Sequence, residues 1–200
     1  MPVEIRGVTF SGNKGEGEAA DIYIWWCDLC IMDSLTFSGS SITSTSYGLN
    51  IFVWYQETNN NIEITNCVFN CRPEHDPDAI TTQLTGSSAD TASAVFAWLS
   101  NVTLSNNEFY NCWGAEKGGA MHMRSRVAIT DTESTYVNSS ALEGGAIFCS
   151  TNCVLTMTRS KIVNNRARNG AAAVFESTST LTATELTISG NSALLDAGAF

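Results

Sequence analysis

Carboxylate side chains with the potential for metal or acid–base chemistry are concentrated in one polar stretch, RPEHDPD. Glu74, Asp76 and Asp78 carry oxygen atoms of the type that Ca²⁺ prefers, and His75 could act beside them as a base. The stretch lacks the glycine pattern of a calcium loop. We therefore expect residues 72–92 to form a solvated insertion loop and not a calcium site.

Hydrolysis of a polysaccharide needs two carboxyl groups on one face at a fixed separation. Asp28 and Asp33 are close in the sequence, but no neighbouring repeat supplies a carboxylate to join them. We therefore predict a protein that is not an enzyme, without a catalytic residue, a metal site or a cofactor. A polysaccharide lyase or hydrolase remains the alternative.

The chain has seven cysteines, a number that indicates an oxidising compartment and leaves one thiol over. Cys71 and Cys112 occupy nearly equivalent places in successive repeats, so a disulfide between neighbouring coils is expected there. Cys149 and Cys153 are candidates for a bridge across a turn, and Cys67 is expected to point inward as a small core residue.

Closely spaced cysteines such as Cys27 and Cys30 resemble metal ligands, but the chain has only two histidines to complete a site, His75 and His122. Asn101 and Asn138 begin glycosylation sequons. Such triplets also arise by chance in a chain rich in Ser, Thr and Asn, and glycans are expected only if the source is eukaryotic.

The elements that position these residues repeat with a period of about 26 residues, apart from two longer intervals. Each repeat has an apolar residue at the start of a polar turn, at Phe10, Phe37, Phe69, Phe109, Tyr136, Ile162 and Ile188. Asparagines such as Asn165 and Asn191 follow three residues later and predict stacked amides at the inner edge of the turn.

Two short strands flank this turn in every repeat, because apolar residues alternate with polar ones on both sides. Before the turn, inward pairs such as Ile62/Ile64 recur, and in the repeat of Tyr136 the pair is expected two residues early, at Val127/Ile129. After the turn, inward pairs of a third strand recur at Ile22/Ile24, Ile51/Val53, Val95/Ala97, Met121/Met123 and Ile147/Cys149. Val174 is expected to start the next pair, which Glu176 breaks.

The alternate residues of the third strand are predicted to point outward. They are Tyr23/Trp25, Phe52/Trp54 and Phe96/Trp98, followed by His122/Arg124, Phe148 and Phe175. Stacked in register, they would form an apolar stripe that a soluble monomer rarely leaves bare. Three interpretations stay open: the 72–92 loop covers the stripe, another subunit covers it, or sugars stack on it.

Three short strands per repeat and no helical period predict an all-β, right-handed parallel β-helix of about seven coils in a single domain, 1–200. Hydrophobic content is 44% and charged content only 15%, which suits a continuous core with a surface of Ser, Thr, Asn and Gly. We expect the chain to be a fragment of a longer protein or a stackable subunit, since its first and last residues lie within repeats.

The repeats resemble those of the chlamydial polymorphic outer-membrane proteins, which pair FxxN with GGA[ILV]. The matching segments are Phe10-Ser11-Gly12-Asn13, Gly118-Gly119-Ala120-Met121, Gly144-Gly145-Ala146-Ile147 and the looser Ala197-Gly198-Ala199-Phe200. More broadly, the chain is similar to the pectin-lyase-like β-helix proteins. The resemblance implies the fold and an adhesive or surface role, and it implies no substrate.

The formal net charge of −10 argues against nucleic acid as a partner, because no basic stripe is present to neutralise phosphates. We predict an extracellular or cell-surface structural or adhesive protein that forms filaments through its coil ends and its aromatic stripe. Glycans are an alternative partner, which would make the chain a carbohydrate-binding module. A membrane contact would require segments outside this sequence.

Overall fold

The computed structural model describes residues 2–15, 19, 21–42, 49–54, 61–71, 94–114 and 116–198 of the chain. The expected insertion loop at 72–92, with Glu74, His75, Asp76 and Asp78, lies outside the described residues.

Three long sheets form the protein, and every strand pairing in its described part is parallel. The first sheet has seven strands, β1 (Val3–Arg6), β5 (Leu29–Asp33), β9 (Asn61–Thr65), β12 (Asn101–Ser105), β15 (Ala128–Thr132), β19 (Val154–Thr158) and β23 (Thr180–Thr184). The second sheet also has seven, β2 (Thr9–Ser11), β6 (Thr36–Ser38), β10 (Val68–Asn70), β13 (Glu108–Tyr110), β16 (Thr135–Val137), β20 (Lys161–Val163) and β24 (Thr187–Ser189).

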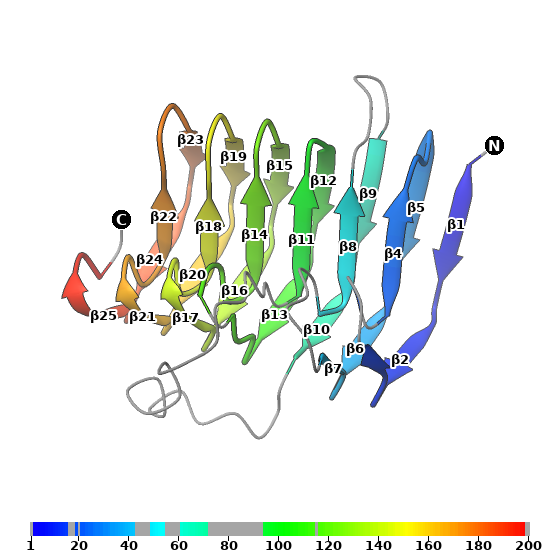
Figure 1. Ribbon diagram of the computed structural model, residues 1–200, viewed down its shortest axis with the longest axis horizontal. Coiled ribbons are helices and arrows are strands. Elements are labelled where there is room, and N and C mark those ends of the chain that lie inside the picture. Colours follow the sequence, from blue (N-terminus) through cyan, green and yellow to red (C-terminus); the bar gives the residue numbers. More distant parts are fainter. Residues whose placement is uncertain are drawn as a thin grey trace.

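The third sheet has six strands, β4 (Ile22–Trp25), β8 (Ile51–Trp54), β11 (Val95–Trp98), β14 (Met121–Arg124), β18 (Ile147–Cys149) and β22 (Ala173–Phe175). Further strands pair at the remaining corner, namely β3 (Lys14–Gly15), β7 (Ser41–Ile42), β17 (Ser140–Glu143), β21 (Arg166–Asn169) and β25 (Ser192–Asp196). The chain visits the first, second and third sheets in turn, so each circuit is one coil of a parallel β-solenoid, as the repeat predicted (Figure 1).

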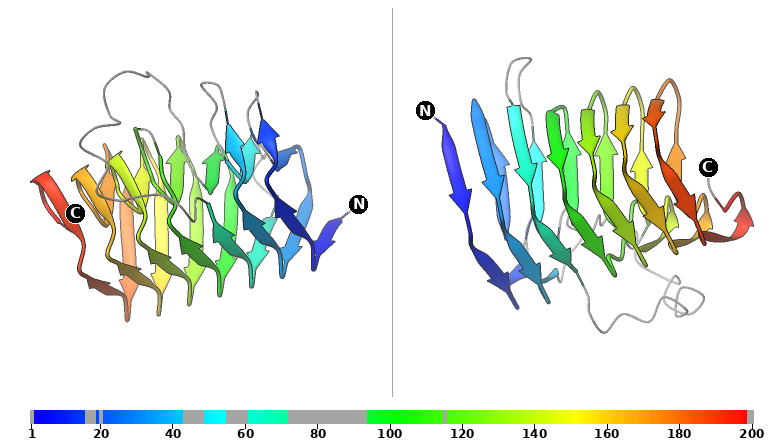
Figure 2. Two further views of the ribbon diagram at one scale, coloured as in Figure 1. Left: turned by 90° about the horizontal axis from the view of Figure 1, so that it is seen from below. Right: turned by 180° about the vertical axis from the view of Figure 1, so that it is seen from behind.

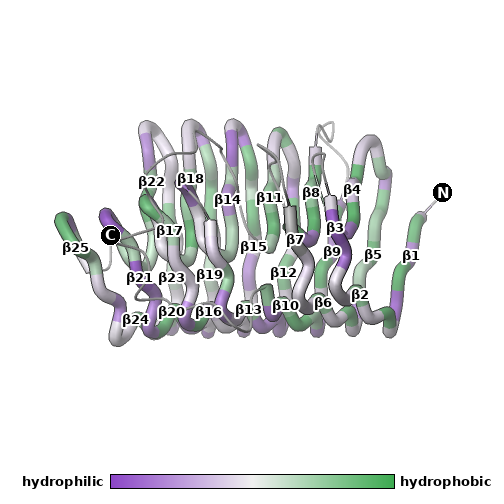
Figure 3. Tube along the Cα trace, turned by 60° about the horizontal axis from the view of Figure 1, so that its bottom comes forward, coloured by the Kyte–Doolittle hydropathy of each residue, from purple (hydrophilic) through white to green (hydrophobic). Residues whose placement is uncertain are grey.

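The coils follow one another along the long axis of the molecule, with the two chain ends at opposite ends (Figure 1 and Figure 2). Hydrophobic residues recur at equivalent places in successive coils (Figure 3). This recurrence is the physical basis of the fold, because parallel in-register pairing places like side chains over one another, and one coil alone could not bury them.

The apolar residues at the turn form one unbroken column through the second sheet, as the sequence predicted. Phe10 pairs with Phe37, and the register continues to Ile188 at the other end. The ring centroids of Phe10, Phe37, Phe69, Phe109 and Tyr136 follow one another at 5.0, 4.8, 4.6 and 4.7 Å. Their planes are within 10° of parallel, so these rings pack face to face in the core.

Side-chain amides support the turn that follows this column. The Asn165 side chain accepts a hydrogen bond from the Ser139 backbone N–H at 2.8 Å, and Asn191 accepts one from the Asn165 backbone N–H at 2.8 Å. These bonds satisfy buried backbone donors that the coil leaves unpaired, and they confirm the structural role expected for this asparagine column.

The inward pair in the coil of Tyr136 was predicted wrongly. Val102 pairs with Ile129 and Leu104 pairs with Asp131, so the register is unbroken and the pair is Ile129/Asp131 in place of Val127/Ile129. Backbone pairing over all five residues of β15 outweighs the preference of one carboxylate for water. A fully buried Asp131 is the consequence.

The register of β22 also differs from expectation. Ala173 pairs with Ile147 and Val174 pairs with Phe148, so Val174 takes the outward place. Phe175 pairs with Cys149 and packs against the core, where the sequence pattern had placed it outside. Glu176 therefore follows the inward pair and does not interrupt it.

Candidate functional site

The outer face of the third sheet carries two columns of mainly aromatic side chains, as predicted. One column is Tyr23, Phe52, Phe96, His122 and Phe148. The other is Trp25, Trp54, Trp98 and Arg124. Both arise from the alternation of β-strands, which turns every second residue away from the core.

The tryptophan column is stacked like the rings of the core. The ring centroids of Trp25 and Trp54 lie 6.1 Å apart, and those of Trp54 and Trp98 lie 5.6 Å apart, with planes inclined by 17° and 15°. The guanidinium carbon of Arg124 lies 4.9 Å from the centroid of Trp98, which is a cation–π contact. The tryptophan rings therefore stack face to face. The terminal ring, Trp25, has a stacking neighbour in its column on one side only.

The exposed part of this surface is concentrated at β4. Trp25 is 60% exposed, Trp26 is 56% exposed and Tyr23 is 40% exposed. We call these three residues the aromatic patch. Sequence reasoning missed Trp26, because the residue follows the strand and has a left-handed backbone with φ of 58°, outside the alternation that identified its neighbours.

The rest of the first column is continuous with Tyr23 in register but buried. Phe52, Phe96, His122 and Phe148 are almost completely inaccessible to solvent. Lys117 contributes to this cover, since its ammonium lies 4.4 Å from the centroid of Phe148. The interpretation in which the 72–92 loop covers the stripe falls outside the described residues.

His122 is unsuited to acid–base chemistry in this environment. Burial lowers its pKa to about 3, and the charges of Lys117 and Arg124 act in the same direction. The ring packs edge-on against Phe96 and Phe148, and its Nδ1 has no hydrogen-bond partner. The imidazole therefore stays neutral and serves as one more flat ring in the column.

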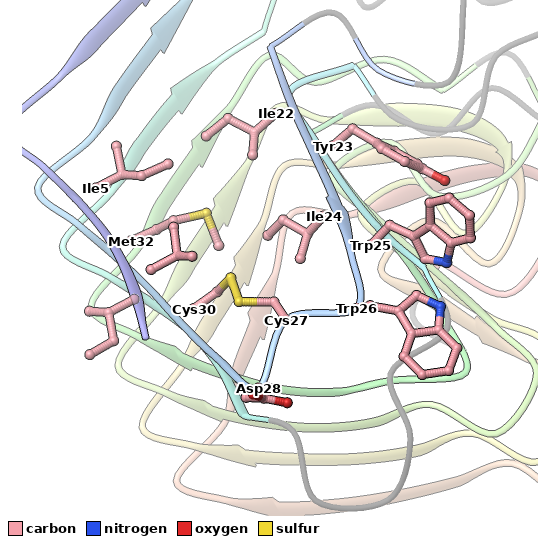
Figure 4. A pocket seen from close by; sticks show the side chains of 12 residues that line it. Ile5, Ile22, Tyr23, Ile24, Trp25, Trp26, Cys27, Asp28, Cys30 and Met32 are labelled. Atoms are coloured by element: carbon pink, nitrogen blue, oxygen red, sulfur yellow. A yellow bond between two sulfur atoms is a disulfide. The ribbon is translucent and has the colours of Figure 1, made fainter. Parts of the chain in front are cut away.

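A cavity of about 390 Å³ lies beside the aromatic patch at the open edge of β4 (Figure 4). Ile22 and Ile24 point to one side of the strand, toward Met32, while Tyr23 and Trp25 point to the other side. The cavity therefore joins an apolar core wall to the exposed aromatic patch, and its lining has little charge.

A disulfide between Cys27 and Cys30 forms the corner of this cavity. In the sequence, the close spacing of these cysteines resembles that of metal ligands and did not predict a bridge. Their separation of three residues across a tight turn, with Cα atoms 6.0 Å apart, is compatible with a bridge.

A second disulfide joins Cys71 to Cys112 across neighbouring coils, where stacking had predicted it. The bridge expected between Cys149 and Cys153 is absent, and both are free, buried thiols. The Cys149 sulfur lies 3.2 Å from the Met123 sulfur, while the Cys153 thiol donates to the Met123 carbonyl oxygen at 3.6 Å. Burial raises the pKa of both thiols, which keeps them protonated.

The carboxylates considered for hydrolysis do not converge. Asp28 is exposed in the turn before β5, while Asp33 is the last residue of that strand. Asp33 accepts hydrogen bonds from Asn66, Thr65 and Arg6 at 2.8, 3.1 and 2.8 Å. The pKa of Asp33 is lowered, chiefly by the Asn66 bond, so this group is ionised and structural.

The two sequons lie on the surface. Asn101 begins β12 and is exposed, and Asn138 is exposed in a turn with φ of 53°. Their glycosylation stays a prediction. No helix in the described ranges is long and apolar enough to cross a membrane.

Comparison with known proteins agrees with this architecture. No curated protein and no solved structure gives a significant match to the chain. The family model for the right-handed β-helix region matches residues 3–193, which is nearly the whole chain. With its parallel coils and stacked core columns, the chain belongs to the right-handed β-helix family.

Proposed function

We propose that this β-helix is a structural or adhesive component exposed outside the cell, and that copies of it associate through the aromatic patch at β4. The observation that carries the proposal is the exposure of Tyr23, Trp25 and Trp26 beside one another at β4. Large aromatic side chains are enriched in protein interfaces and rarely left bare in a cluster.

A second copy is a suitable occupant because the aromatic column is complementary to itself. The Trp25 ring stacks on the Trp54 ring with one of its faces. The Tyr23 ring stacks on Phe52 in the same way, with ring centroids 5.1 Å apart. β4 is also an edge strand of its sheet, with backbone groups able to pair with an added strand. Stacking of coil ends would extend the same packing into a filament.

The compartment is proposed from the cysteines. Disulfides at Cys27–Cys30 and Cys71–Cys112 persist in oxidising surroundings such as the extracellular space. The repeats that resemble chlamydial surface proteins support the same location. The right-handed β-helix family contains both enzymes and non-enzymes, so the proposal rests on the surface and not on family membership.

The proposal is tested by sedimentation velocity over a range of concentrations. Association of the natural chain should strengthen with added salt, because salt screens the repulsion between copies of net charge −10 and leaves apolar contacts intact. The double variant Trp25→Ala/Trp26→Ala should bind roughly 30-fold more weakly, since loss of an aromatic anchor costs about 2 kcal/mol or more.

Val154→Ala is the matched control, because Val154 is an exposed apolar residue on the first sheet, away from β4. Its association should equal that of the natural chain. A natural chain that stays monomeric at high micromolar concentration in high salt would refute self-association through this patch.

Carbohydrate binding is the second candidate, and the exposed Trp25 ring favours it. Rings that stack on one another leave little face for a sugar, but Trp25 ends its column. Titration of soluble glycans followed by tryptophan fluorescence distinguishes the two candidates. A monomeric chain that binds a glycan, and loses it in the Trp25→Ala variant, would replace the self-association proposal.

A further inference from the structure

Asp131 is a carboxylate in a column of otherwise apolar core residues. Its place on β15 is aligned with Leu104 on one side and Met157 on the other, and the column continues to Ile64 and Met32. The Asp131 side chain has no exposure to solvent. A carboxylate in such a place is costly when ionised unless several groups bond to it.

The bonding around this carboxyl group is incomplete. The Ser160 hydroxyl donates to Oδ2 of Asp131 at 2.8 Å, whereas Oδ1 has no hydrogen-bond partner. The buried hydroxyl of Tyr136 influences the pKa of the same carboxyl group, but it does not meet the geometry of a hydrogen bond. Tyr136 is also the one ring in the turn column with a hydroxyl, so both polar substitutions fall in a single coil.

The other groups around Asp131 do not supply a compensating positive charge. Ser134 and Ser160 act on it from the turns and Tyr136 acts on it from β16, while the buried Cys149 thiol of β18 acts on Tyr136. Within the described part of the chain, no cation contributes to the shift of the Asp131 pKa. This carboxyl group is therefore solvated by hydroxyls alone.

We propose that Asp131 makes the core of the β-helix responsive to pH, so that the central coils are tightened in mildly acidic surroundings and loosened when the carboxyl group ionises near neutrality. The device is independent of the aromatic patch and of the proposed self-association. It gives the protein a different resistance to unfolding in acidic and neutral surroundings.

The direction follows from proton linkage. Burial raises the pKa of Asp131 from 3.8 to about 6, while the hydroxyl groups of Ser134, Ser160 and Tyr136 oppose the rise. Because the folded state holds the proton more tightly, the stabilisation is full below pH 3.8, declines as the pH rises toward 6, and is lost above that value. A difference of about two units corresponds to roughly a 100-fold change in the unfolding equilibrium constant.

The first test is urea unfolding of the complete chain and of Asp131→Asn at about pH 4.5 and pH 7.5. The unfolding constant of the natural chain should rise roughly 25-fold more between these conditions than that of the variant. Comparing the two proteins cancels the opposite effect of His122, which both retain. Glu185→Gln, which removes one exposed carboxylate, should follow the natural chain.

The second test does not require a variant that folds. The side-chain carboxyl ¹³C signal of Asp131 should titrate with a midpoint near 6 in the natural chain. Tyr136→Phe should move this midpoint upward, since the hydroxyl lowers the pKa of Asp131. A midpoint near or below 4, or parallel pH profiles for the natural chain and Asp131→Asn, would overturn the proposal.

Discussion

Two buried ionisable residues, His122 and Asp131, have pKa values shifted in opposite directions on the pH scale. Burial favours the uncharged form in both cases, so it lowers the pKa of the histidine and raises that of the acid. They face opposite sides of the sheets, one on the outer face of β14 and one in the core beneath β15. Their contributions to stability therefore oppose each other between about pH 4 and pH 6.

Replacing His122 by Phe should remove the loss of stability that protonation of the unfolded-state imidazole causes as the pH falls below 6.5. The folded pKa of about 3 lies below the ordinary 6.5, so the contribution of His122 is present above pH 6.5 and is lost as the pH falls toward 3. Phe suits the site, which lies between Phe96 and Phe148. Relative to the natural chain, the variant should gain about 2 kcal/mol in unfolding free energy between pH 7.5 and pH 5.

Urea unfolding at the two pH values provides this measurement. Parallel behaviour of His122→Phe and the natural chain would mean that the imidazole is protonated in the folded state, contrary to its burial among rings.

At the level of the elements, the turns before the third sheet depend on glycine in left-handed conformation and in close contact with backbone. Gly118 and Gly144 have φ of 62° and 65° and precede β14 and β18. A Cβ atom on Gly144 would overlap the carbonyl oxygen of Ile147. The GGA motif is therefore a requirement of the corner, where the chain turns back over its own strand.

Gly144→Ala should destabilise the protein by at least about 2 kcal/mol more than Gly12→Ala. The two glycines have nearly equal φ, 65° and 64°, but nothing lies within 4 Å of a Cβ atom on Gly12. The pair therefore separates the backbone clash from the cost of the left-handed conformation. Unfolding in urea gives the comparison, and equal losses would show that conformation alone accounts for both.

For the whole molecule, stability depends on contacts between coils that are distant along the chain. The Cys71–Cys112 disulfide spans 41 residues and connects neighbouring coils, while Cys27–Cys30 spans only three. A longer closed loop restricts the unfolded chain more. The first bridge is thus expected to limit global unfolding, and the second to support only the local corner beside β4.

Replacing Cys71 and Cys112 by Ser should cost about 2 kcal/mol more than replacing Cys27 and Cys30 by Ser, from the difference in loop length. Thermal and urea unfolding of the two double variants gives the comparison, with mass spectrometry to verify the remaining bridge. A greater loss from the short bridge would show that native-state packing at the cavity dominates over chain entropy.

The sequence alone determined the parallel stacking, because residues that recur with one period can be buried together only if like side chains pair in register. The columns through Phe109 and through Trp54 follow directly from that spacing. Only the tertiary structure decided which outward rings stay exposed, that Phe175 turns inward, and that Asp131 enters the core. These outcomes depend on which distant segments bury a side chain and on the register of whole strands. A local sequence pattern contains neither kind of information.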